Sequence, residues 1–147
     1  MQARVTSGNV TGASAKTILA VLASATRRVK LKQLIISCTD TPADATAVFR
    51  VGFITADGTG TARTTVAVDS ADGAPSCTAK KNYTGEPTYA TNDLAYIGLN
   101  QRTTLIWNPP FEGEFVSNLS GGANLGIAIQ MVSGPALNYD VDAQWQE

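Results

Sequence analysis

The stretch Ala47-Val48-Phe49-Arg50-Val51-Gly52-Phe53 decides the fold class, because apolar side chains occupy every second position in it. Successive side chains of a β-strand point to opposite faces of a sheet, so this alternation predicts a strand with one buried face and one wet face. Residues 125–131 and 139–145 alternate in the same way and predict two more such strands. The apolar residues of these three stretches are expected to form the core: Phe49, Val51, Phe53, Leu125, Ile127, Ile129, Val141 and Trp145.

Weaker patterns predict further strands. Residues 28–39 are predicted to form a strand with a bulge near Gln33, because the apolar positions change phase there. Residues 16–22 could form a strand or nearly two turns of helix, and the strand is favoured because the segment contains β-branched residues. Residues 94–99 and 103–107 are expected to be two short strands.

The connections between these segments point to an all-β architecture. Residues 61–68 are predicted to pair with 47–54 in a hairpin, because the Gly-rich turn at 57–60 suits positive backbone angles. Residues 69–92 and the proline-containing segment 108–113 are predicted to be loops. Roughly eight to ten short strands with such connections predict an antiparallel β-sandwich or jelly roll with long loops.

The chain has 147 residues, which suits a single domain spanning residues 1–147. Residues 1–10 could form a flexible N-terminal arm. The longest apolar run, Ile18–Ala23, is far shorter than the roughly 20 residues of a membrane-spanning helix, so no membrane partner is expected. The opening residues lack the order of a secretory signal, and synthesis in a cytosol is therefore expected.

The sequence favours a protein that is not an enzyme and that binds no cofactor. It contains no histidine, which is the usual general base near neutral pH and the commonest metal ligand. It also lacks the glycine-rich pattern that cradles nucleotide phosphates. Glu112 with Glu114, or Asp140 with Asp142, could share one strand face as an acid and base pair, although solvated acids are the commoner arrangement.

The cysteines and one acidic segment are further candidates for chemistry. Cys38 continues the apolar phase of its predicted strand and is expected to be a buried thiol, whereas Cys77 falls in a loop-like stretch; a disulfide between them remains an alternative. Asp69 and Asp72 lack the regular ligand spacing of a calcium loop, so no metal is expected.

Charge is distributed unevenly along the chain. Residues 1–39 contain basic residues and no acids, and residues 103–147 contain acids and no bases. Such polarity could orient the protein against a charged partner, or the charges could mix once the two ends pair in one sheet. Arg28, Lys30 and Lys32 are candidate partner contacts, while the near-neutral net charge and the lack of a base-stacking motif disfavour nucleic acid.

Five segments in order give the chain a family resemblance. They are Thr11–Leu19, Arg28–Leu31, Asn82–Thr88, Gly121–Ile127 and Trp145–Glu147. Read in this order, the chain resembles the capsid decoration, or cement, proteins of tailed bacteriophages.

The resemblance implies a structural β-rich virion protein on the capsid surface, made in the host cytoplasm. It implies a homotrimer that binds the major capsid protein lattice and stabilises the shell, with no catalytic or cofactor residues. Asn82, Tyr83, Glu86 and Pro87 belong to the most distinctive segment and join the candidate partner contacts. The alternative is a carbohydrate-binding or host-attachment β-sandwich of a phage, which would require exposed aromatic rings, with Trp107 as a candidate.

Overall fold

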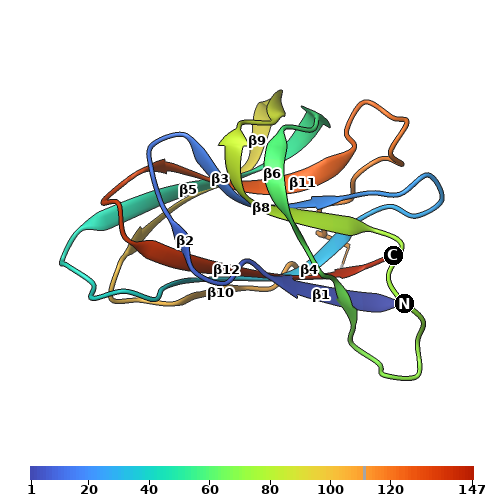
Figure 1. Cartoon of the computed structure of the whole chain (residues 1–147), viewed down its shortest axis with the longest axis horizontal. Helices are drawn as coiled ribbons and strands as arrows, with labels where there is room; N and C mark the ends of the chain where they lie inside the picture. Colours follow the sequence, from blue (N-terminus) through green and yellow to red (C-terminus); the bar gives the residue numbers. More distant parts are fainter. Residues whose placement is uncertain (111) are drawn as a thin grey trace.

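The computed structural model describes residues 1–110 and 112–147, which form two six-stranded antiparallel sheets packed face to face (Figure 1). The predicted all-β sandwich is therefore confirmed, and the described residues include no helix. Phe111, inside the predicted proline-containing loop, lies outside the described residues.

The first sheet contains the two ends of the chain. Its strands are β1 (Gln2–Thr6), β2 (Val10–Thr11), β4 (Lys30–Cys38), β7 (Val66–Ala67), β10 (Leu105–Trp107) and β12 (Asn138–Gln146). The strand order is β10-β4-β12-β1-β7, and β2 pairs with the beginning of β12. Side chains of β12 alternate between buried and half-buried positions, as its sequence predicts.

Residues 1–10, which could have formed a flexible arm, contain β1 and Val10, the first residue of β2. β1 pairs with both β12 and β7, and its Ala3 and Val5 are buried in the core. The apolar side chains at every second position explain why this short segment joins the sheet. In β4, the register against β12 shifts between Leu31 and Gln33, which confirms the predicted bulge.

The second sheet contains the strand predicted from residues 47–53. Its strands are β3 (Lys16–Leu22), β5 (Thr46–Ala56), β6 (Thr59–Arg63), β8 (Thr78–Gly85), β9 (Thr88–Asn100) and β11 (Gly126–Ser133). The strand order is β6-β8-β3-β11-β5-β9, so β5, the strand predicted from residues 47–53, lies between β11 and β9. The strand expected at residues 16–22 is confirmed.

The predicted hairpin between residues 47–54 and 61–68 is wrong. β5 pairs with β11 and β9, whereas β6 pairs with β8. β6 is largely exposed and has no apolar face to offer, while β9 and β11 provide apolar side chains on both sides of β5. Residues 57–58 connect β5 to β6 without reversing the chain, and a Cβ on Gly58 would lie 2.1 Å from the carbonyl oxygen of Gly85.

The long loop predicted at residues 69–92 is also largely wrong. Residues 78–85 form β8, and β9 begins at Thr88. β8 buries only Ala79 and Tyr83, so its sequence shows little periodicity. The connection that remains outside the strands lies between β7 and β8.

Most of the predicted core is buried between the sheets. Phe49, Val51, Ile127, Ile129, Val141 and Trp145 are buried, whereas Phe53 and Leu125 are half-buried. Both cysteines are free: Cys38 is half-buried and not buried as expected, whereas Cys77, in the connection before β8, is buried. Burial raises the pKa of the Cys77 thiol to about 12.

A second, smaller cluster covers the other face of the second sheet. It consists of Ala20, Ile54, Tyr83 and Ala128, with Tyr89 packed against it. The sheet can cover its own face because β5 continues into β6 and β8 continues into β9. These two long segments pair with each other twice, β5 with β9 and β6 with β8. The second sheet therefore curls around a core of its own.

Candidate functional site

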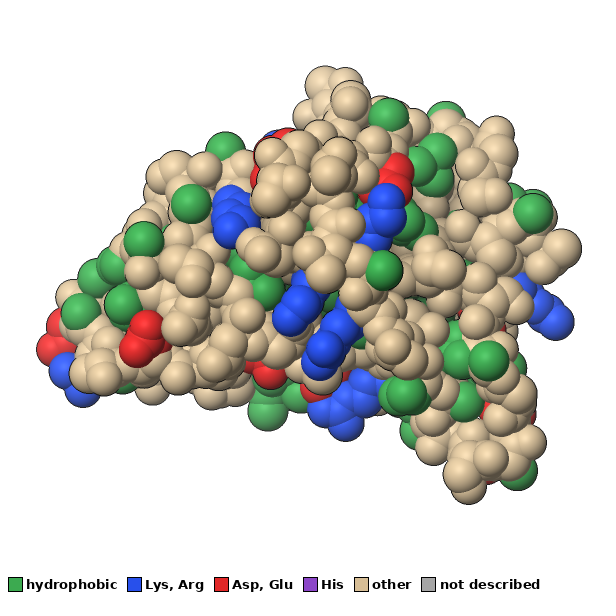
Figure 2. All heavy atoms as spheres, in the orientation of Figure 1, with side chains coloured by type: hydrophobic (Ala, Val, Ile, Leu, Met, Phe, Trp, Pro, Cys, Tyr) green, Lys and Arg blue, Asp and Glu red, His purple; other side chains and the backbone are tan. Residues whose placement is uncertain are grey.

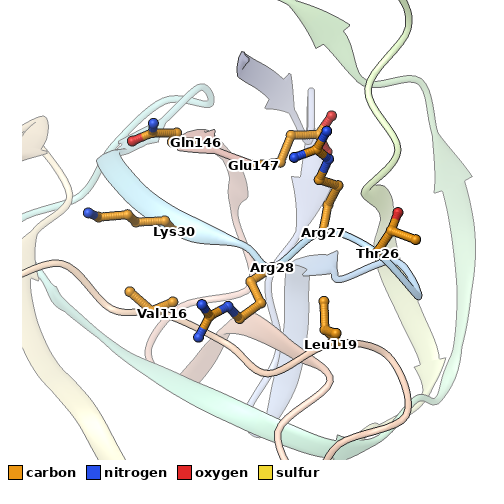
Figure 3. Close-up of a pocket in the computed structure, with 8 residues that line it drawn as sticks. All are labelled: Thr26, Arg27, Arg28, Lys30, Val116, Leu119, Gln146 and Glu147. Atoms are coloured by element: carbon orange, nitrogen blue, oxygen red, sulfur yellow. The ribbon is translucent and has the colours of Figure 1, made fainter.

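Charged side chains are sparse on the face of the molecule in Figure 2, and most of its surface is uncharged. The basic stretch of the sequence analysis lies at an open hollow of about 590 Å³ (Figure 3). The hollow is lined by Thr26, Arg27, Arg28, Lys30, Val116, Leu119, Gln146 and Glu147. A neighbouring hollow of about 680 Å³ shares Arg28 and Leu119 and extends to Gly121 and Gly122.

Backbone contacts fix the basic side of the hollow. The hydroxyl of Ser24 accepts a hydrogen bond from the Arg27 amide at 2.9 Å, which holds the turn before β4. Val29 is fully buried, and its amide donates to the Ser117 hydroxyl at 3.0 Å. Because the chain is anchored on both sides of Arg28, the exposed Arg28 side chain is directed outward to the hollow (Figure 3).

The opposite side of the hollow comes from the segment before β11. The Leu31 amide donates to the Phe115 carbonyl at 2.9 Å, and the Ser117 amide donates to the Val29 carbonyl at 2.9 Å. This pairing places Val116 and Leu119 beside Arg28, where they are 38% and 41% exposed. The hollow therefore combines cationic and exposed apolar side chains.

The cations of this region differ in their availability. Lys32 contacts the carboxylate of Glu114, and the Lys30 ammonium lies 3.7 Å from the same carboxylate. The hydrogen bond from Lys32 lowers the pKa of Glu114. Arg28 has no ion pair within residues 1–110 and 112–147, so it is the cation most available to a partner.

Glu147 limits the availability of Arg27. Its carboxylate accepts hydrogen bonds from the amides of Ser76 and Cys77 at 2.9 and 2.8 Å. Burial opposes ionisation here, but these amide bonds and the positive charge of Arg27 lower the pKa of Glu147 on balance. Arg27 is therefore partly neutralised, unlike Arg28.

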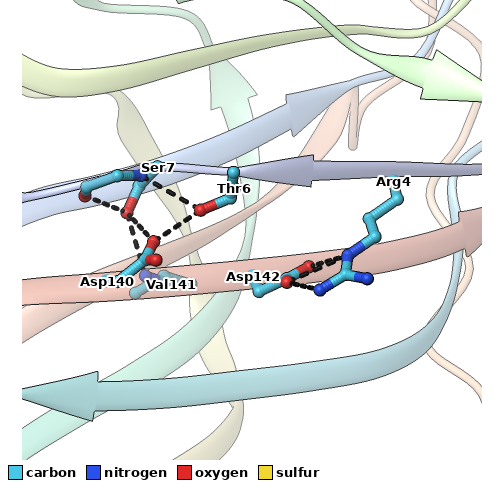
Figure 4. A network of polar contacts seen from close by, with 7 residues as sticks. Arg4, Thr6, Ser7, Asp140, Val141 and Asp142 are labelled. Atoms are coloured by element: carbon cyan, nitrogen blue, oxygen red, sulfur yellow. Dashed lines mark hydrogen bonds and ion pairs between the residues drawn. The ribbon is translucent and has the colours of Figure 1, made fainter.

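The charge asymmetry of the sequence is partly resolved inside the molecule. Arg4 of β1 pairs with Asp142 of β12, just as Lys30 and Lys32 pair with Glu114 (Figure 4). The ion pair and hydrogen bonds with Asp142 raise the pKa of Arg4. The charges of the two ends are thus partly mixed once the ends share a sheet, whereas Arg28 forms no ion pair with the described residues.

The candidate residues 82–87 do not join the hollow. Tyr83 and Pro87, expected to contact a partner, are buried, and the Tyr83 hydroxyl donates to Asp57 at 3.0 Å. Asn82 is half-buried in β8 with a positive φ of 49°. The carboxylate of Glu86 accepts a hydrogen bond from the Thr17 amide at 2.9 Å. This segment lies against β3 instead.

Glu86 belongs to a polar network on the curled sheet. Its carboxylate also accepts a hydrogen bond from the Gln130 amide group at 3.1 Å, and Arg50 donates to Gln130 at 2.7 Å. The Arg50 guanidinium lies 4.0 Å from the centre of the Tyr89 ring, and burial raises the pKa of that tyrosine. Each polar group has a partner, so the network fixes how β8 and β9 sit on β3, β5 and β11.

The paired acids have local partners. Asp140 and Asp142 do share one side of β12, as predicted, and both are half-buried (Figure 4). Asp140 accepts hydrogen bonds from Thr6 and Ser7 at 2.7 and 3.1 Å, and Asp142 pairs with Arg4. The two carboxylates thus connect β12 to β1 and to Ser7, the residue that follows β1.

The tryptophans do not form the exposed platform that sugar binding requires. Trp145 is fully buried. Trp107 is half-buried and stacks on Phe115, with ring centroids 5.0 Å apart. Tyr83 is buried, and Tyr89 lies beneath Arg50.

Comparisons with protein-family models, with curated proteins and with solved structures give no match for this chain. In the described part of the chain no His, Cys, Asp and Glu side chains gather in a group that could hold a metal ion. The same residues contain no helix that is long and apolar enough to cross a membrane.

Proposed function

We propose that this chain is a structural virion protein that decorates and stabilises a phage capsid. It binds the major capsid protein lattice as a trimer, with the hollow around Arg28 as its contact surface. The proposal rests on the family resemblance and on the place where the resembling segments meet in the fold.

The observation that supports the proposal best is that three of the resembling segments meet in the fold. Arg28–Leu31, Gly121–Ile127 and Trp145–Glu147 are far apart in the sequence, yet all three contribute residues to the two adjoining hollows. The other two resembling segments, Thr11–Leu19 and Asn82–Thr88, meet each other through the hydrogen bond between Thr17 and Glu86. Three of the resembling segments therefore share one surface, and the other two share one contact within the chain.

The chemistry of the hollow suits a protein surface that presents an acidic side chain beside an apolar one. Arg28 offers a guanidinium that no described residue pairs with, and its fork geometry matches a carboxylate. Val116 and Leu119 offer apolar surface on the same hollow. A single contact of this size would be weak, but a trimer on a repeated lattice gains affinity through multivalency.

Binding to purified, undecorated phage shells tests the proposal. Arg28→Glu should weaken binding at least tenfold at low salt, because it places a negative charge opposite an acidic partner. The loss should shrink at high salt, where the screening length falls below about 8 Å. Lys16→Glu makes the same change of charge outside the hollow and serves as the control.

Leu119→Ser tests the apolar part of the surface and should weaken binding almost equally at low and high salt. The proposal would be overturned if the protein failed to bind shells, or if Arg28→Glu and Lys16→Glu behaved alike.

A further inference from the structure

Arg63 and Lys81 form a second group of cations. Arg63 is the last residue of β6, and Lys81 lies on β8. A terminal guanidinium nitrogen of Arg63 and the ammonium of Lys81 lie 3.6 and 3.7 Å from the position that a Cβ on Gly8 would occupy. Two positive groups thus approach the same glycine.

The fold holds these cations in place. The Nε of Arg63 donates to the carbonyl of Thr6 at 2.8 Å, which fixes the guanidinium and leaves its terminal N–H groups for other acceptors. Thr61 pairs with Lys81 across β6 and β8, so both cations come from one pair of strands. Neither side chain forms an ion pair with any described residue.

Gly8 leaves the space between the cations open. Its φ of 59° belongs to the left-handed region that glycine favours, and it has no side chain to fill the gap. A hollow of about 500 Å³ is lined by Arg63 together with Arg4, Thr6 and Val66, and gives access to the guanidinium. Like charges held near each other repel, and a bound anion would relieve that repulsion.

We infer that Arg63, Lys81 and Gly8 form a binding site for a multiply charged oxyanion, such as a phosphate or a dicarboxylate. The guanidinium supplies directed N–H donors, and the ammonium supplies a compact charge. The inference does not depend on the proposed function, since none of these residues lines the hollow around Arg28.

Thermal unfolding tests the site with two probes, sodium phosphate and sodium malonate. Each is compared with sodium chloride at equal ionic strength. A ligand that binds only the folded state raises the unfolding midpoint as its concentration rises. We expect at least one probe to raise the midpoint well beyond chloride, and the stronger probe identifies the class of oxyanion.

Two variants attribute the response to these residues. Lys81→Met and Arg63→Gln should each remove most of the specific increase, whereas Lys16→Met should retain it. If neither probe exceeds chloride, or if Lys81→Met and Lys16→Met respond equally, the inference is wrong. If Arg63→Gln unfolds because it loses its bond to Thr6, Lys81→Met still decides the question.

Discussion

At the scale of single residues, Glu114 determines how much of the basic stretch 28–32 is available to a partner. It neutralises Lys32 and lies near Lys30, which leaves Arg28 alone. The sequence could identify the basic run, but not this partner, because Glu114 lies in a segment without periodicity. Val116 and Leu119 could not be predicted as part of the site either. Their place beside β4 depends on a long-range pairing of Val116 with Lys30.

The contact between Lys32 and Glu114 predicts a pH dependence of stability. Because the pKa of Glu114 is lower in the folded state, its contribution is present above the unfolded pKa of about 4.3 and is lost as the pH falls through the folded value. Glu114→Gln should therefore lower the urea midpoint at neutral pH, and the difference should disappear once the pH lies below the lowered pKa that Glu114 has in the folded state. A difference that grows on acidification would contradict this, and Asp72→Asn serves as the control.

The buried face of β11 gives a second residue-scale prediction. Ile127 is 1% exposed between the sheets, so Ile127→Ala should cost roughly 2 to 5 kcal/mol of unfolding free energy. Ile106→Ala is the matched control, because Ile106 is 60% exposed on β10 and its loss should change stability little. Chemical denaturation of both variants checks the assignment, which fails if the two midpoints shift equally.

At the scale of elements, Glu86 attaches the bend between β8 and β9 to β3. It accepts the Thr17 amide where the register of β3 against β11 shifts, at Gln130. Glu86→Ala would leave this buried amide without its acceptor, at a cost of about 1 to 3 kcal/mol. Hydrogen exchange should show faster exchange of the Thr17 amide, and Asp72→Ala, an exposed acid, should show no such change.

The elements also show why sequence patterns succeed or fail. β12 was predicted residue by residue because one of its faces is dry and the other wet. β8 was missed because it lies over a small second cluster, and a strand that buries only Ala79 and Tyr83 has little alternation to detect. The hairpin turn predicted at 57–60 is wrong, because the chain runs on there from β5 into β6; pairing partners depend on apolar faces elsewhere in the chain.

At the scale of the whole molecule, the sandwich brings distant segments to one surface. β4, the segment after β10 and the end of β12 meet around the hollow, so the resembling segments become neighbours only in the folded chain. The sequence could suggest which segments matter through their order. It could not predict that Tyr83 and Pro87 are buried, since that depends on the curl of the second sheet.

The most direct test of the account is a cryo-electron microscopy map of phage particles that contain this protein. The account predicts trimeric β-sandwich density on the outside of the shell, with Arg28, Val116 and Leu119 facing the major capsid protein. Density inside the shell or only on the tail would contradict the proposed function. A decorating subunit whose hollow around Arg28 faces solvent would contradict the proposed contact surface.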